Sequence, residues 1–238
     1  MRKVRADLHL HTCLSPCADT QMQATAIVER AKEVGLDMIG ICDHNSAENV
    51  AAVVKAGLRQ GLTVIPGMEI TSSEEVHILG LFNSEQDVMY VQDKVYDNLR
   101  GENYEEAFGP QTIVDEWDNV IGTNLRLLIG ATTLSVEQIV EAIHSRAGLA
   151  IASHVDRERF SLVGQLGFIP KGLGLDALEV STAPSINQGY DYPVVTFSDA
   201  HFLEDIGTSS TCFMIETISV GEISKALHNE MGRRIIVH

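Results

Sequence analysis

The sequence predicts an α/β barrel, and two observations lead to this expectation. First, strand-sized apolar runs alternate with longer amphipathic segments of helical period from residue 4 to the end of the sequence, which is typical of a parallel sheet with crossover helices. Second, residues with metal-binding side chains recur where those strands end, and the strand ends of a barrel meet on one face. The strand–helix units are too many for a small doubly wound sheet, so a barrel is favoured.

The first expected strand, VRADLHL at 4–10, sets the pattern for the others. Successive side chains of a strand point to opposite faces, so His9 and His11 share one face while Leu8 and Leu10 take the other. An amphipathic segment follows and ends at Gly35, which is typical of a helix terminus. Further strands are expected at 37–45, 62–70, 76–82, 149–155, 177–182, 194–202, 211–216 and 234–238, with helices at 24–35, 47–57, 136–148, about 160–167 and 220–229.

Composition limits the class of protein. With 238 residues and 45% hydrophobic content, residues 1–238 are expected to form a single domain with a helical or loop insertion at about 84–121. The net charge of -16 argues against nucleic-acid polymers and anionic membranes as partners, unless a basic patch or bound cations reverse the charge locally. The apolar runs are shorter than the roughly 20 residues of a membrane span. Four cysteines without a disulfide pattern, and no export leader, favour a reduced, cytoplasmic protein.

Histidines gather at the expected strand ends. Of the nine in the sequence, we expect His144, His228 and His238 to be structural because they lie on helices or at the last position. The other six accompany acidic residues at strand ends, and unrelated core histidines would not be expected to share such positions. The strand-end set is His9, His11, Asp43, His44, Glu69, His77, His154, Asp199 and His201.

Five motifs carry a family resemblance. DLHLHT, CDHN, PGMEI, SHV and SDAH resemble the ordered motifs of the PHP (polymerase and histidinol phosphatase) superfamily, and they run from residue 7 to residue 201. The resemblance implies a distorted (β/α)7 barrel with a three-metal centre at the C-terminal ends of the strands and a metal-dependent, histidinol-phosphatase-like hydrolase of phosphate esters. It implies His9, His11, Glu69 and Asp199 as ligands of the first metal, Glu69, His77 and His154 of the second, and Asp19, His44 and His201 of the third.

The types of ligand indicate which metals to expect. Imidazoles mixed with carboxylates suit zinc, manganese or iron better than calcium or magnesium. Two or three such ions about 3.5 to 4 Å apart can share a hydroxide that attacks phosphorus, so no protein nucleophile is expected. Cys17 and Asp19 both compete for the third metal, and Asp19 is favoured because a hard carboxylate matches a phosphatase metal better than a thiolate does. Asp7 and Asp43 either orient neighbouring imidazoles or cap turns.

Two arginines are candidates for phosphate binding. Arg157 and Arg159 lie just beyond the SHV motif, and a planar guanidinium can bind two phosphate oxygens at once. The alternative is that they form surface salt bridges with Asp156 and Glu158. Asn45 is a weaker candidate for substrate binding.

Several function classes remain open at this stage. The favoured one is a phosphoesterase acting on a small phosphorylated substrate, since the set of metal ligands is complete. The alternatives are a nuclease or exonuclease acting on nucleic-acid ends, and a non-catalytic metal-binding protein. An amidohydrolase-like enzyme also begins with His-x-His on a barrel strand, but it requires a carbamylated lysine that the sequence does not place. The leaving group, the native metal and the oligomeric state are not predicted.

Overall fold

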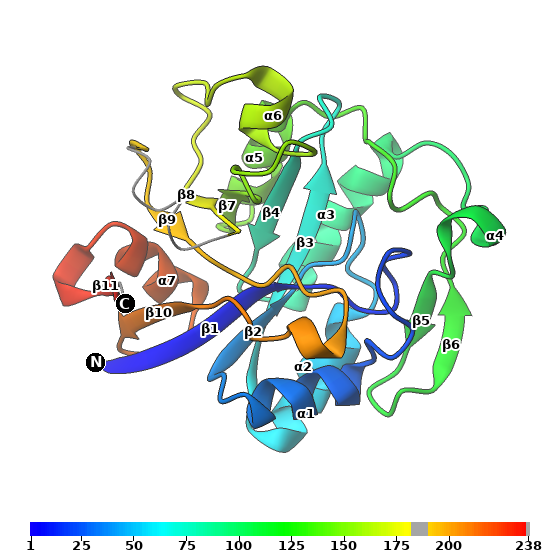
Figure 1. Ribbon diagram of the computed structural model, residues 1–238, viewed down its shortest axis with the longest axis horizontal. Coiled ribbons are helices and arrows are strands. Elements are labelled where there is room, and N and C mark those ends of the chain that lie inside the picture. The colour runs from blue at the N-terminus through cyan, green and yellow to red at the C-terminus, as the bar shows by residue number, and fades with distance from the viewer. Residues whose placement is uncertain (182–189, 237–238) are drawn as a thin grey trace.

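The computed structural model describes residues 1–181 and 190–236, and a mixed sheet of nine strands forms its centre (Figure 1). The strand order is β11-β10-β1-β2-β3-β4-β7-β8-β9. The strands are β1 (Arg2–Leu10), β2 (Met38–Ile41), β3 (Thr63–Thr71), β4 (His77–Leu81), β7 (Leu149–Ala152), β8 (Ala177–Glu179), β9 (Val194–Val195), β10 (Thr211–Ile215) and β11 (Arg234–Ile236). Thr182, Val237 and His238, at the ends of predicted strands, lie outside the described residues.

The sheet curls because the chain returns from β9 to the end of β1. Leu10 and Ala200 form a parallel bridge, the His11 N–H donates to the Ala200 carbonyl at 3.0 Å, and the Ala200 N–H donates to the His9 carbonyl at 3.2 Å. The strands β1-β2-β3-β4-β7-β8-β9 thus form a barrel-like ring, while β10 and β11 extend the sheet beyond β1. The predicted distorted barrel is confirmed.

One strand runs against the predicted parallel direction. β4 pairs antiparallel with β3, Thr71 opposite His77, and also antiparallel with β7. The expectation of a parallel sheet throughout is wrong here because residues 72–76 are too few for a crossover, which needs about a dozen residues. His77 therefore lies at the first position of β4 but at the same sheet edge as the carboxyl end of β3.

Helices cover the sheet, and the alternation of side chains along the strands divides the core. Ile78 packs in a cluster that includes residues of α1, α2, α3 and α5, whereas the next residue, Leu79, packs in a second cluster that includes residues of α7. The helices are α1 (Ala24–Glu33), α2 (Val50–Gln60), α3 (Glu85–Asn98), α4 (Glu105–Phe108), α5 (Val136–His144), α6 (Leu162–Leu166) and α7 (Val220–Leu227), with 3-10 turns at Leu203–Asp205 and Glu230–Gly232.

The segment after β4 carries its own small sheet. It contains α3, α4 and an antiparallel hairpin of β5 (Thr112–Val114) and β6 (Val120–Thr123), which lies beside the barrel (Figure 1). The side chain of Gln111 connects the start of the hairpin with the residues that follow β6. Its amide donates to the carbonyls of Asn124 and Arg126, and its oxygen accepts from the Leu128 N–H. Among the described residues, no helix combines the length and apolar character needed to cross a membrane.

Candidate metal centre

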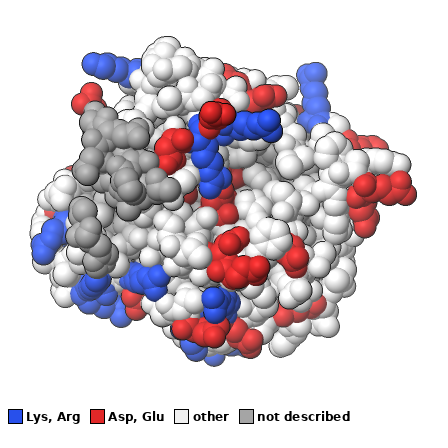
Figure 2. All heavy atoms as spheres, viewed as in Figure 1, with Lys and Arg blue, Asp and Glu red and all other residues white. Residues whose placement is uncertain are grey.

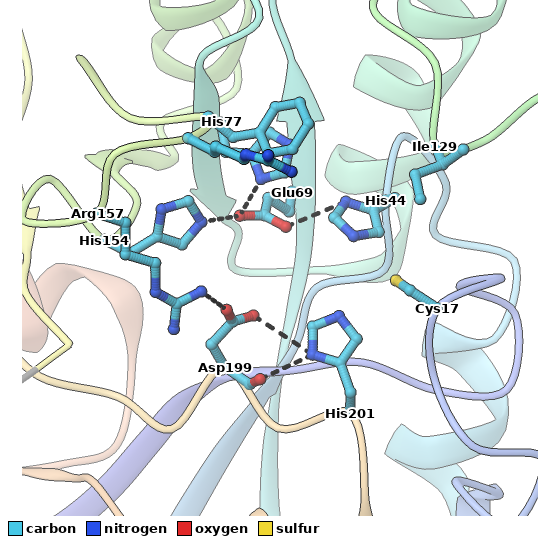
Figure 3. Close-up of a pocket in the computed structure, with 11 residues that line it drawn as sticks. Cys17, His44, Glu69, His77, Ile129, His154, Arg157, Asp199 and His201 are labelled. Atoms are coloured by element: carbon cyan, nitrogen blue, oxygen red, sulfur yellow. Dashed lines mark hydrogen bonds and ion pairs between the residues drawn. The ribbon is translucent and has the colours of Figure 1, made fainter. Parts of the chain in front are cut away.

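Eight of the predicted metal ligands converge at one end of the barrel. Three groups of ligand atoms each lie within 4.8 Å of one another, and Figure 3 shows part of the arrangement. The groups are His9, His11, Glu69 and Asp199; His44, Glu69 and His77; and His11, His44 and His201. His154 joins them, since its Nε2 lies 3.5 Å from a Glu69 oxygen.

Glu69, near the end of β3, occupies the middle of this cluster and is 1% exposed. Burial would raise the pKa of its carboxyl group, but the imidazoles of His77 and His9 hold this pKa well below its usual range. The two oxygens face different partners, as expected of a carboxylate that bridges two cations. Oε1 lies 3.0 Å from His77 Nδ1, 3.3 Å from His9 Nε2 and 3.5 Å from His154 Nε2, and Oε2 lies 3.1 Å from His44 Nδ1 and 3.5 Å from His11 Nε2.

Asp199 faces the two histidines of β1 from the segment that follows β9. Its Oδ1 lies 3.2 Å from His11 Nε2 and 3.3 Å from His9 Nε2. Burial would raise the pKa of Asp199, but His9 and His11 keep it well below its usual range. Asp199 and His154 have backbone φ angles of 52° and 32°, in the left-handed region that side chains rarely adopt. Such strain is characteristic of functional sites, where surrounding structure holds it.

The donor atoms of this cluster fit divalent metal ions. Among the described residues, Nδ1 of His44, His77 and His154 and both Glu69 oxygens are buried without a hydrogen-bond partner. Each such atom costs about 1 to 3 kcal/mol, and a cation coordinated by it would remove that cost. Burial, with His201 nearby, lowers the pKa of His11 to about 4, so its imidazole is neutral, as a metal ligand must be.

Glu179 supports the cluster, although the sequence analysis did not select it. It ends β8, is 1% exposed, and accepts a hydrogen bond from His9 Nδ1, with the oxygens 2.9 and 3.1 Å away. This contact orients His9 so that Nε2 faces Glu69 and Asp199. The strand expected from the sequence runs over 177–182, so Glu179 lies inside it and the strand-end criterion did not select this residue, whereas the observed β8 ends at Glu179.

Asp43 holds the loop after β1. It accepts hydrogen bonds from the Thr12 N–H and hydroxyl and from the Ser15 hydroxyl, each at 2.7 Å. The Ser15 Oγ in turn accepts from His11 Nδ1 at 3.0 Å and from the His44 N–H at 3.1 Å. Asp43 therefore acts on the imidazole of His11 through Ser15, so it both fastens a turn and orients a ligand.

Asp7 holds the segment that carries Asp199 and His201. Its oxygens accept from the Ser198 N–H at 3.0 Å, the Ser198 hydroxyl at 2.6 Å and the Gly207 N–H at 2.9 Å. Burial raises the pKa of Asp7 to about 6. Asp7 makes no direct hydrogen bond with a histidine among these contacts, so the structure favours the turn-fastening role for it.

Two predicted site residues, Asp19 and Asn45, contact the protein backbone. The carboxylate of Asp19 accepts from the Gln21 N–H at 2.8 Å, and Asp19 is outside the three groups of ligand atoms. Asn45 is buried and its amide donates at 2.8 Å to the carbonyls of Leu128 and Gly130. Both N–H groups of the Asn45 side-chain amide are donated to these carbonyls, so this side chain has no free donor for a substrate.

Both predicted arginines line the pocket above the cluster, a cavity of about 300 Å³ (Figure 3). Arg157 Nη1 lies 2.5 Å from Asp199 Oδ2, and its Nε donates to the Ser181 hydroxyl at 2.8 Å. Arg159 makes no ion pair or hydrogen bond with the described part of the chain. The alternative that it forms salt bridges with Asp156 and Glu158 is therefore not observed for Arg159. Figure 2 shows basic and acidic side chains meeting near the middle of this face.

Comparison with known proteins places this geometry in a family. The PHP domain model matches residues 7–157. The chain is similar to phosphoribosyl 1,2-cyclic phosphate 1,2-diphosphodiesterase of Eggerthella lenta, with 31% identity over 80 residues that make up 32% of this chain and 29% of that one. It is also similar to the 5'-3' exoribonuclease Rnm of Escherichia coli, with 36% identity over 80 residues, or 32% of this chain and 26% of that one.

Among solved structures, the lesion-specific endonuclease PfuEndoQ of Pyrococcus furiosus has the same fold. The TM-score is 0.74 at 22% identity, and the match covers 98% of this chain and 58% of the endonuclease. The matches thus span less than a third of the two curated relatives and a little over half of the endonuclease.

These relatives correct the expectation about partners. The argument that net charge disfavours nucleic acid is wrong as an exclusion, since an exoribonuclease and an endonuclease are among the similar proteins. Net charge is a property of the whole chain, whereas a substrate meets the local field, which Arg157 and Arg159 make more positive and which bound cations would make more positive still. With a family model covering more than half of its residues, this chain belongs to the PHP domain family.

Proposed function

We propose that this protein hydrolyses phosphodiester bonds of nucleic acid at the metal centre described above. The observation that carries the proposal is the buried, closely spaced group of histidine and carboxylate atoms around Glu69, in a pocket that is also lined by two arginines. When bound, divalent metal ions would neutralise phosphate charge and lower the pKa of a coordinated water.

Each metal position would draw on ligands from different strands. His9, His11, Glu69 and Asp199 would hold one ion, Glu69, His77 and His154 a second, and His11, His44 and His201 a third. The side chains come from the ends of β1, β2, β3 and β7, the start of β4 and the segment after β9, so barrel closure is required to assemble them. Two or three ions, of zinc, manganese or iron, suit these donors.

Arg157 and Arg159 would bind the phosphate group. Arg159 has no intramolecular partner among the described residues, which leaves its guanidinium available. Arg157 contacts Asp199, and a cation coordinated by Asp199 would compete with this ion pair and release the guanidinium for two-pronged contact with phosphate oxygens. Each arginine would then stabilise the negative charge that develops during attack on phosphorus.

Two arguments support a phosphodiester rather than a phosphomonoester. The similar proteins include a diphosphodiesterase, an exoribonuclease and an endonuclease, and the substrates of these three share the diester group. The pocket is also lined by the apolar side chains of Ile129 and Phe160, which are 36% and 39% exposed and offer surface to the organic groups on either side of a diester.

A substrate panel tests the proposal. Protein loaded with zinc or manganese would be assayed with end-labelled single-stranded RNA and DNA, duplex DNA with an abasic site, bis(p-nitrophenyl) phosphate and p-nitrophenyl phosphate. We expect metal-dependent cleavage of at least one nucleic acid and of the synthetic diester. Turnover of the monoester alone would contradict the proposal and favour the small phosphate ester. A Glu222→Gln variant is the matched control, because this buried glutamate on α7 pairs with Lys225 and Arg233 rather than with the cluster.

A further inference from the structure

A second cavity lies between α6 and the chain that enters β9, and the metal centre does not use it (Figure 1). It measures about 580 Å³, whereas the pocket that contains the cluster measures about 300 Å³. Among the described residues, the two cavities share no lining side chain. Cavities that bind small organic molecules measure roughly 300 to 1,000 Å³, so this one is large enough for a nucleotide-sized group.

Three aromatic rings line this cavity. Phe168, just beyond the end of α6, is 63% exposed, and Tyr190 and Tyr192, which precede β9, are half-buried. Both tyrosines pack against the main core cluster, as does Ile169 beside Phe168, so the core supports this wall of the cavity. Exposed aromatic rings bind nucleobases by stacking, because every base has a flat π-face.

Two charged side chains, Lys171 and Asp191, complete the lining, and both are exposed. Their charges balance, so the cavity does not select an isolated phosphate. Lys171 can bind a phosphate of a nucleic-acid strand, and Asp191 can accept a hydrogen bond from an exocyclic amino group of a base. This combination of aromatic, basic and acidic groups fits a nucleobase together with its own phosphate.

Two segments of chain connect the cavity with the pocket of the metal centre. Phe160 lines the pocket and Val163 lines the cavity, and three residues of chain span at most about 11 Å. Burial and the nearby charge of Asp156 raise the pKa of Tyr190, and Asp156 directly precedes Arg157 of the pocket. A strand bound at the metal centre can therefore continue into the cavity.

We propose that this cavity is a base-stacking subsite for single-stranded nucleic acid, which holds a nucleobase next to the phosphodiester bound at the metal centre. This inference rests on the proposed function and narrows it to a class of substrate. A base can stack on protein rings only when it has left a duplex, so the strand must be unpaired beside the cleaved bond. Phe168 would be the main contact, because its ring is exposed and lies at the end of a helix.

Oligonucleotide binding tests the subsite separately from cleavage. Metal-loaded protein would be titrated into two fluorescein-labelled single strands of equal length, one with thymine at every position and one without bases. Both would have phosphorothioate links, which resist hydrolysis, and fluorescence anisotropy would give Kd. We expect the parent protein to bind the thymine strand more tightly than the base-free strand.

Phe168→Ala should weaken binding of the thymine strand by roughly 5-fold to 150-fold, as expected for the loss of one stacked base, and leave the base-free strand near the parent Kd. Lys171→Gln should weaken binding of both strands and reduce its dependence on salt. Tyr104→Ala is the matched control and should bind both strands like the parent, because Tyr104 is an aromatic residue that is 60% exposed and lines neither cavity.

The other outcomes separate this inference from the proposed function. Equal affinity of the parent for the two strands, binding of neither, or an unchanged Kd in Phe168→Ala would overturn the subsite. A dimer in sedimentation that Phe168→Ala abolishes, without base-dependent binding, would assign the cavity to a second copy of the chain and also overturn it. Metal-dependent turnover of bis(p-nitrophenyl) phosphate by the parent is measured alongside. Turnover without base-dependent binding refutes the subsite alone, whereas base-dependent binding without turnover of any diester supports the subsite and contradicts the proposed hydrolysis.

Discussion

Glu69→Gln is the substitution from which the structure predicts the largest chemical effect at the least change in shape. The side-chain volume is kept, but one carboxylate oxygen becomes an NH₂ group, which donates hydrogen bonds and cannot bind a cation. The two oxygens face different histidines, so the change disrupts one side of the bridge and removes the charge shared by both sides. Losing one group that stabilises charge in the transition state costs about 2.7 to 4 kcal/mol. This corresponds to a fall of roughly 100-fold to 1,000-fold in kcat/KM.

The assay compares Glu69→Gln with the parent and with Glu222→Gln on one accepted diester. Each protein is loaded with the same metal, its metal content is measured by elemental analysis, and its fold is checked by circular dichroism. We expect Glu69→Gln to be folded, to bind less metal and to lose at least ~100-fold in activity, and the control variant to remain near the parent. A folded Glu69→Gln protein with full metal content and activity within about 3-fold of the parent would refute the bridging role.

Four further predictions concern the surroundings of the cluster. Arg157→Lys and Arg159→Lys should each lower kcat/KM by roughly 10-fold to 150-fold at unchanged metal content, and parental kinetics in both would remove the arginines from the site. Glu179→Gln should weaken metal binding by about 10-fold to 100-fold in equilibrium dialysis, because His9 loses its charged partner; equal affinities would contradict this. Removing metal with a chelator should lower the free energy of unfolding by about 4 kcal/mol when free metal had been 1,000 times Kd, and an unchanged denaturation midpoint would argue against bound metal. In metal-free protein, burial raises the pKa of Asp7 to about 6, above its unfolded value, so its protonation stabilises the fold below the unfolded pKa and this contribution is lost as pH rises through 6. The stability advantage of the parent over Asp7→Asn should thus be about 2 to 3 kcal/mol larger at pH 4 than at pH 7.5, and an advantage independent of pH would disprove the shift.

The sequence by itself determined where the metal-binding side chains would gather. Period-two alternation in VRADLHL puts His9 and His11 on one face, and the order of strands and helices puts Glu69, His154 and Asp199 at one end of a barrel. These inferences succeed because strand periodicity is a local property that residue patterns express. The direction of β4, which the residue pattern did not reveal, came from the tertiary structure.

Only the tertiary structure decided the roles that depend on contacts between distant segments. Glu179 hydrogen-bonds His9 from a position 170 residues away in the sequence. The side-chain amide of Asn45 donates to two backbone carbonyls that lie more than 80 positions away. The folded loop after β1 brings Cys17 to the pocket and holds the Asp19 carboxylate against the Gln21 N–H, and side-chain direction in an irregular loop has no period that the sequence could express. The prediction that net charge disfavours nucleic-acid partners was wrong for the same reason. Net charge sums the whole chain, whereas a substrate meets only the charges that folding brings to the pocket.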